Sequence, residues 1–340
     1  MTQNNIAAPL RSNNRSRLWN QVRFWVGIVV SVGCLYLALR DIDLPKVGQA
    51  LTQADYRPVA AAVAVVVLSA FTRAARWRVL FYPRQQNLRF SKLFSIILIG
   101  QTINIAIPAR LGDVARAYLI GELEGRSKAL ALGTIAVEKL ADMVMLVVLF
   151  LALVPVMALP RWLTDPGRAT ALVVAVFTVL MLVVAYQRER LLLLTGKLLS
   201  VFPELAREKI VPRLERALGS LDVLHDWRAI LGLTAWTLAT WGLYVLNNWL
   251  VLIATGLKPS WLVATFLLVV LQAGVAVPSS PGKLGVFHYL CILSLAVFGV
   301  PRPVALSYGV ILHLVVNVPP VLLGVFFLWR ENLSLRRLAG

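Results

Sequence analysis

Three charged side chains follow a break in an apolar run, at a spacing that suits the binding of an anion. Arg110, Asp113 and Arg116 succeed one another at intervals of three, and residues three apart lie on one face of a helix. Guanidinium groups bind phosphate oxygens through paired, charge-assisted hydrogen bonds. The sequence therefore predicts a phosphate clamp with its own balancing carboxylate. It leaves open the alternative of a salt bridge at a membrane surface.

A second charged set, Glu138, Lys139 and Asp142, lies early in another apolar run. Ionisable residues inside a membrane span are costly and mark functional positions by default. Glu138 and Asp142 are four apart, so both carboxylates point to one side, toward the bundle interior or a cavity. We predict that this set binds ions or protons and, if the protein is a transporter, couples their movement to that of its substrate. The alternative is a structural ion pair with Lys139 or a neighbouring Arg.

The break before Arg110 has a near copy 170 positions later. In both copies an aliphatic-Ala-aliphatic-Pro sequence is followed by a glycine four residues after the proline. Matched interruptions in two halves of a membrane protein indicate a binding site between half-helices, whose N-terminal amides attract anions. The predicted hinge residues are Pro108, Gly112, Pro278, Pro281, Gly282 and Gly285. The alternative is a pair of ordinary proline kinks.

The elements that hold these residues are membrane helices. The chain has 340 residues, of which 59% are hydrophobic and 15% charged, and its mean hydropathy is +0.76. Such a chain is predicted to form an all-α polytopic bundle, because these runs do not alternate as barrel strands do. About six full spans and two interrupted or re-entrant hairpins are expected. The spans are placed at 24–39, 59–72, 129–160, 169–187, 229–257 and 303–329.

The placement of the basic residues orients these spans. The net charge is +18, and most Lys and Arg residues gather in 1–23, 73–92, 109–128, 188–228 and 330–340. This is the positive-inside pattern rather than that of a nucleic-acid-binding protein. Both termini are therefore expected in the cytoplasm, with the first hairpin entering from the cytoplasm and the second from outside. That arrangement is typical of inverted repeats.

The predicted organisation is a single transmembrane domain over 24–330. A cytoplasmic leader, 1–23, precedes it and a short tail, 331–340, follows. Its repeat-like halves, 24–187 and 229–330, are joined by an amphipathic cytoplasmic connector, 188–228. Cys34 and Cys291 lie in apolar runs, and no metal site or disulfide framework is predicted from them. A phosphate-binding Gly-x4-Gly-Lys-Ser/Thr loop does not occur, so neither ATP nor another cofactor is expected.

The two motifs resemble those of a known family. Gly100-x3-Asn104-x3-Pro108-x-Arg110-x-Gly112-Asp113-x2-Arg116, with the later Pro278-x2-Pro281-Gly282-x2-Gly285, is similar to the lysylphosphatidylglycerol synthase transmembrane family, also called the flippase-like domain family. The resemblance covers nearly the whole chain. It implies a bacterial inner-membrane protein that moves or handles a lipid between leaflets, with Asn104 among the binding residues. The soluble aminoacyl-transferase domain of bifunctional members is not expected here, nor is their synthase activity.

Two positions depart from the family pattern and bear on the substrate. Lys283 stands where the family commonly has a second glycine, and His288 stands where it commonly has an acid. Both are therefore predicted to contact the head group and to alter its selection. The leading interpretation is a lipid transporter without enzymatic activity that binds an anionic or phosphate-bearing head group. Separately encoded lipid-synthesis enzymes are possible partners.

Two other classes of function stay open. One is a glycosyltransferase-like membrane enzyme that modifies a lipid or a polyprenyl-linked sugar, for which Asp41 and Asp43 give slight support as a metal-binding pair. The other is a scaffold for a lipid-synthesis partner.

Overall fold

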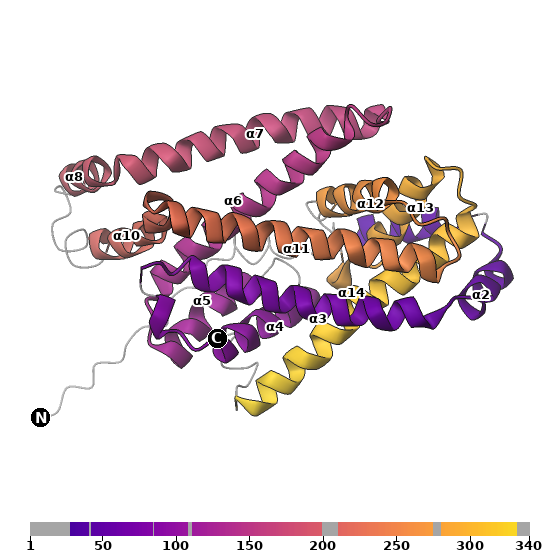
Figure 1. Ribbon diagram of the computed structural model, residues 1–340, viewed down its shortest axis with the longest axis horizontal. Coiled ribbons are helices and arrows are strands. Elements are labelled where there is room, and N and C mark those ends of the chain that lie inside the picture. Colours follow the sequence, from indigo (N-terminus) through magenta and orange to yellow (C-terminus); the bar gives the residue numbers. More distant parts are fainter. Residues whose placement is uncertain are drawn as a thin grey trace, which may run out of the picture.

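The computed structural model describes residues 28–40, 42–83, 85–107, 111–198, 210–274 and 280–331. Every regular element in these ranges is a helix, which confirms the predicted all-α membrane bundle (Figure 1). The elements are a helix at Ile28–Leu39, α2 (Leu44–Thr52), α3 (Tyr56–Val79), η1 (Gln85–Asn87), α4 (Phe90–Ala106), α5 (Leu111–Glu124), α6 (Lys128–Leu153), α7 (Arg161–Tyr186), α8 (Arg188–Leu198), α10 (Val211–Leu218), η4 (Gly219–His225), α11 (Trp227–Ala254), α12 (Trp261–Gly274), η5 (Pro281–Lys283), α13 (Val286–Ala296) and α14 (Arg302–Arg330).

Four of the described helices, α3, α7, α11 and α14, are long and apolar enough to cross a membrane. They correspond to four of the six predicted spans. A fifth helix, α6, is as long as α7, at 26 residues, but it carries four ionisable residues, Lys128, Glu138, Lys139 and Asp142. The first predicted span, 24–39, is described only from Ile28 onward.

The longest packing interface joins α3 to α11, which run antiparallel (Figure 1). Hydrogen bonds fix this pairing at three heights. Asp55 N donates to Ala254 O at 2.9 Å where α3 begins and α11 ends. The Thr72 and Thr240 hydroxyls meet at 2.9 Å, and Tyr82 donates to Asp226 Oδ2 at 2.9 Å where α11 begins.

The same packing order recurs on either side of this pair. After α3 come two short helices, α4 and α5, and then the long α6; after α11 come α12, α13 and then the long α14. Helix α3 packs on α4 as α11 packs on α12, and α5 packs on α6 as α13 packs on α14. Across the halves, α4 packs on α14 and α12 packs on α6. The buried apolar side chains of the described residues form one large cluster around α4 to α6 and another around α12 to α14, with a smaller third cluster where α6, α7 and α12 meet.

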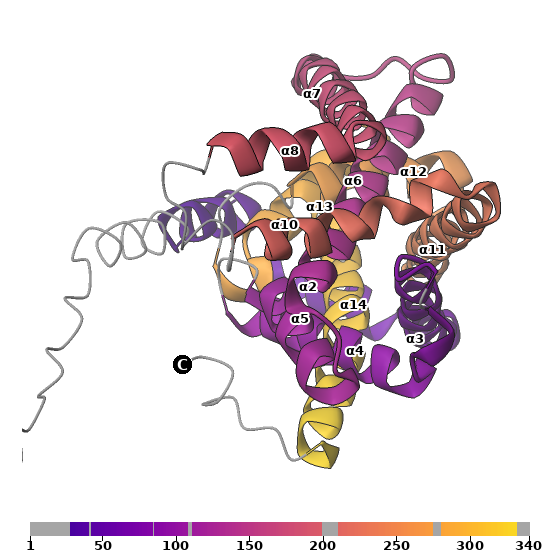
Figure 2. The same ribbon diagram turned by 90° about the vertical axis from the view of Figure 1, so that its left-hand side faces the viewer.

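The described part of the predicted connector, 188–228, is helical except at Asp226, which caps α11. Helices α8 and α10 lie side by side at one end of the bundle (Figure 2), and η4 leads from α10 into α11. Arg188 Nη1 lies 2.8 Å from Asp222 Oδ1, which ties the start of α8 to η4. The connector therefore covers the end of the bundle at which α3 and α7 end and α6 and α11 begin.

Candidate functional site

The first hairpin, α4 and α5, is closed by small residues and one amide. Asn104 Oδ1 accepts a hydrogen bond from Gly112 N at 2.8 Å. A Cβ atom on Gly112 would collide with the carbonyl oxygen of Gly100, and one on Gly100 would lie 2.5 Å from Arg116 Cγ. The absence of side chains at Gly100 and Gly112 thus lets α5 approach α4 closely enough to bury Arg116.

Arg116 belongs to a group of charged side chains held between α3, α5 and α6. Its Nη2 donates to Glu138 Oε2 at 2.7 Å. Arg76 Nη2 donates to the other oxygen, Glu138 Oε1, at 3.2 Å, and Arg76 Nη1 donates to Asp142 Oδ1 at 2.6 Å. Glu138 therefore bridges two guanidinium groups that come from different helices.

Two further residues complete this group. Lys139 Nζ lies 3.4 Å from Asp113 Oδ2, and Arg116 Nη1 lies 3.6 Å from Asp113 Oδ1. We call Arg76, Asp113, Arg116, Glu138, Lys139 and Asp142 the ion cluster. It balances three cations with three carboxylates.

The centre of the ion cluster is closed and its edge is open. The side chains of Arg76, Arg116 and Glu138 are each 1% exposed, whereas those of Asp113, Asp142 and Lys139 are 19%, 29% and 37% exposed. Burial of a charge costs several kcal/mol unless it is paired, which explains why the three central groups are mutually bonded. A ligand would meet the cluster at its edge.

Aromatic side chains and neutral polar groups surround the cluster. The Arg116 guanidinium carbon lies 4.3 Å from the ring centroid of Trp77, close enough for a cation–π contact. Trp241 Nε1 donates to Asp142 Oδ1 at 3.2 Å. The buried Nε atoms of Arg76 and Arg116 have no hydrogen-bond partner among the described residues, so these two N–H donors are unused there.

Arg73 lies one turn before Arg76 on α3 and adds a further positive charge. Its Nη1 donates to Gln101 Oε1 at 2.6 Å, and this partner is a neutral amide. The charges of the ion cluster sum to zero, so the cluster together with Arg73 has a net positive charge. An excess cation beside a low-dielectric cluster favours the binding of an anion.

The second hairpin, α12 and α13, is anchored at its tip by neutral groups. Ser280 N donates to Ser31 Oγ at 2.6 Å, and a Cβ on Gly285 would collide with the Ser31 carbonyl oxygen. His313 Nε2 donates to the Gly282 carbonyl oxygen at 2.7 Å. Gly282 and Lys283 both take positive φ angles, 68° and 54°, which makes the turn that starts at Pro281.

The His288 ring lies beside that of His313, with 5.2 Å between centroids. It is buried, and its Nδ1 has no partner in the described part of the chain. The tip of this hairpin, η5, packs against α4 of the first hairpin, so the two hairpin regions meet inside the bundle.

The structure brings together residues that the sequence assigned to two separate sites. Asp113 and Arg116, predicted to bind substrate, and Glu138, Lys139 and Asp142, predicted to couple transport, form one cluster. Glu138 pairs with Arg76 and Arg116, which is the ion pair with a neighbouring Arg that the structural alternative proposed, whereas Lys139 contacts Asp113 rather than Glu138. Asn104 holds the hairpin tip, and Lys283 and His288 lie in the second hairpin. Pro108, Arg110 and Pro278 lie outside the described residues.

Sequence reasoning missed Arg76, which it counted among the basic residues of a cytoplasmic loop at 73–92. That boundary was wrong, because α3 continues to Val79 and Arg76 is fully buried. Two signals could have revealed this. The segment from Thr72 to Val79 contains no helix breaker, and Arg73 and Arg76 are three apart on one face.

Comparisons with known proteins agree with this architecture. The family described as "Lysylphosphatidylglycerol synthase TM region" matches residues 24–324. "Glycosyltransferase AglD" of Haloferax volcanii is 26% identical over 94% of this chain, and the match spans 56% of that relative's length. "UPF0104 membrane protein MJ1595" of Methanocaldococcus jannaschii is 22% identical over 87% of this chain and 91% of its own. No solved structure matches the chain.

Proposed function

Because the chain belongs to the lysylphosphatidylglycerol synthase TM region family, we propose that it carries a phosphate-bearing or otherwise anionic lipid across a membrane. The head group enters at the exposed edge of the ion cluster and is held between the two hairpins. Arg73, Lys139 and Arg116 supply its positive partners. Arg110 and Lys283 are the further predicted contacts.

The single observation that supports this proposal is the Arg116–Glu138–Arg76 bridge. It lies about 15 Å along α6 from Lys128, since ten residues rise 1.5 Å each, and a hydrocarbon core is about 30 Å thick. Burying three ionisable groups at that depth costs free energy. Apolar side chains would hold the helices together without this cost, so a purely structural purpose does not explain the bridge. An anionic head group can replace a cluster carboxylate as the partner of a guanidinium. The charge of the head group is then paired while it crosses the middle of the membrane.

The proposed setting is a bacterial inner membrane with both termini in the cytoplasm. The hairpins then open toward opposite sides, as inverted repeats do. Movement is downhill or coupled to ions or protons through the carboxylates of the cluster. A lipid-synthesis enzyme encoded elsewhere is the natural source of the substrate.

A second candidate function is modification of a lipid or a lipid-linked sugar, which the name of the Haloferax volcanii relative favours. Its local support was the acid pair at Asp41 and Asp43. Asp43 is already engaged, since it caps α2 through Lys46 N and pairs with Lys46 Nζ at 3.0 Å. Asp41 lies outside the described residues.

The test is a leaflet-exchange assay on purified protein in sealed vesicles. Phosphatidylglycerol with a labelled head group is placed in one leaflet, and its arrival in the other is followed with a membrane-impermeant quencher. Protein-free vesicles and vesicles with labelled neutral diacylglycerol serve as controls. Exchange of the anionic lipid with its covalent structure unchanged supports transport. A new lipid product by mass spectrometry, without leaflet exchange, supports the enzyme.

A further inference from the structure

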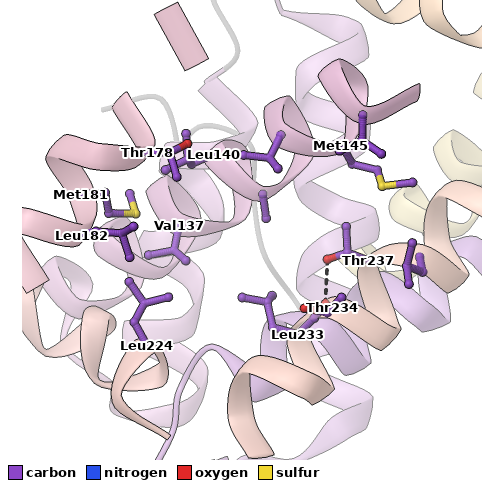
Figure 3. A pocket seen from close by; sticks show the side chains of 14 residues that line it. Val137, Leu140, Met145, Thr178, Met181, Leu182, Leu224, Leu233, Thr234 and Thr237 are labelled. Carbon is purple, nitrogen blue, oxygen red and sulfur yellow. Dashed lines mark hydrogen bonds between the residues drawn. The ribbon is translucent and has the colours of Figure 1, made fainter. Parts of the chain in front are cut away.

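An apolar groove of about 340 Å³ opens between α6, α7 and α11 (Figure 3). This volume lies within the range of ligand pockets, roughly 300–1,000 Å³. Its walls are almost entirely aliphatic and thioether side chains, among them Val137, Leu140, Met145, Met181, Leu182 and Leu233. The groove lies outside the ion cluster.

Three threonines, Thr178, Thr234 and Thr237, carry the hydroxyl groups of the groove, and two of them donate to the backbone. Thr178 Oγ1 donates to Val174 O at 2.7 Å, and Thr237 Oγ1 donates to Leu233 O at 2.7 Å. Both hydroxyls are therefore satisfied by the backbone of their own helix. Because a water needs two to four polar partners, this largely apolar groove suits hydrocarbon better than water.

The groove opens toward the membrane because α7 stands away from the bundle. Helix α7 packs mainly on α6 (Figures 1 and 2), and its side chains are largely exposed, as Leu172, Val176 and Leu180 show. Since α7 is long and apolar enough to span a membrane, these side chains face lipid. An acyl chain can thus enter the groove sideways from the bilayer.

The groove and the ion cluster lie on different sides of the same turns of α6 and α11. Val137, Ala141 and Val144 on α6 line the groove, and they interleave with Glu138 and Asp142, which face the cluster. Helix α11 does the same. Thr237 lines the groove, and Trp241, one turn later, donates to Asp142.

We propose that this groove holds an acyl chain of the lipid whose head group enters the ion cluster, an inference that rests on the function proposed above. A head group at the cluster needs a lateral exit for its tail, and the groove lies at that depth on the membrane-facing side. Met145 and Met181 suit such a site, because thioether side chains adapt to chains of varied shape. Two of the five methionines of the chain line it.

The first test is photolabelling of the native protein in phosphatidylglycerol vesicles. The probe is phosphatidylglycerol with a diazirine in one acyl chain, and labelled peptides are identified by mass spectrometry. Saturable labelling of the segments around Met145 and Met181, suppressed by excess unlabelled phosphatidylglycerol, is expected. Uniform labelling of all lipid-facing helices that excess lipid does not suppress would show ordinary boundary lipid and overturn the inference.

The second test fills the groove. Val144→Trp places an indole in the groove, whereas Val176→Trp places the same indole at a 59% exposed position of α7 that does not line it. Val144→Trp is expected to slow leaflet exchange severalfold and to lose the saturable labelling, while Val176→Trp retains both. Native exchange in Val144→Trp would overturn the groove assignment and leave the transport function standing. Saturable labelling of a native protein that moves no lipid would overturn the transport function and leave the groove as a lipid site.

Discussion

Glu138 Oε2 accepts a hydrogen bond from Arg116 Nη2 at 2.7 Å, which joins the second helix of the first hairpin to α6 in the interior of the bundle. Each of these side chains is 1% exposed. Any movement of the hairpin that brings Arg116 to a new partner must therefore break this bond.

Arg116→Ala is expected to destabilise the protein as well as stop lipid movement. Removal of one partner of a buried ion pair typically costs about 3–5 kcal/mol, and Glu138 would keep only Arg76 as its guanidinium partner. The double variant Arg116→Met, Glu138→Met removes both charges and is expected to recover thermal stability without recovering exchange. Thermal unfolding in detergent and the leaflet-exchange assay measure the two effects. Native exchange in the stable double variant would exclude the pair from head-group handling.

The two carboxylates of α6 are expected to respond differently to neutralisation. Glu138→Gln leaves Arg76 and Arg116 with only the partly exposed Asp142 and Asp113 as counter-charges and should lower the protein level. Asp142→Asn acts at a 29% exposed position and should mainly slow exchange. Protein level by immunoblot and the exchange rate separate the two.

A companion change tests how Lys139 is used. Because Lys139 pairs with Asp113, adding Lys139→Met to Glu138→Gln should not restore the protein level. A restored level would mean that Lys139 and Glu138 are partners after all.

Arg73→Gln is expected to weaken the apparent affinity for the anionic lipid and to leave stability near the native value. Arg73 is half-buried and its partner Gln101 is uncharged, so its removal strands no carboxylate. The concentration of phosphatidylglycerol that half-saturates exchange should rise, and added salt should matter less in the variant. Arg78→Gln is the matched control, since Arg78 lies on the same helix and donates to the backbone oxygen of Gln85. Equal effects of both changes would mean that Arg73 contributes only to the general positive charge and has no specific contact with the lipid.

Gly112→Ala is expected to push the two helices of the first hairpin apart. The new methyl group would collide with the Gly100 carbonyl oxygen and would lie 2.7 Å from Asn104 Oδ1. Overpacking of this kind costs about 1–3 kcal/mol. The control is Gly242→Ala within α11, where the methyl group meets nothing within 4 Å and better helix propensity should raise stability slightly. A thermal midpoint of Gly112→Ala at or above that of Gly242→Ala would contradict the close approach.

Single cysteines at Asn87 and Lys258 are expected to react from opposite sides of the membrane. Asn87 precedes the first hairpin and Lys258 precedes the second, and both are exposed. In a Cys34→Ser background, with Cys291 buried, a membrane-impermeant maleimide should label Asn87→Cys only from the cytoplasm and Lys258→Cys only from outside. Labelling of both cysteines from the same side would contradict the predicted inverted-repeat arrangement.

The sequence was sufficient for the bundle and for the composition of much of the site. Hydropathy located α3, α7, α11 and α14, and the rarity of charges in apolar runs singled out Glu138, Lys139 and Asp142. The pairing of those charges could not be predicted, because it depends on how α3 crosses α6. Sequence reasoning assigned Arg76 to a cytoplasmic loop, because the burial of this side chain depends on neighbours from other helices. Asn104 looked like a ligand, and only the fold of the hairpin reveals its bond to Gly112.

The antiparallel pairing of α3 and α11 has a consequence for any motion of this protein. Hydrogen bonds join the two helices at both ends and in the middle, so sliding or rolling of one against the other would break them. In the proposed transport cycle, this pair of helices therefore stays fixed, and the hairpins with α6, α7 and α14 move around it. Spin labels on α3 and α11 should keep one distance throughout turnover, while labels on α5 and α13 should report two.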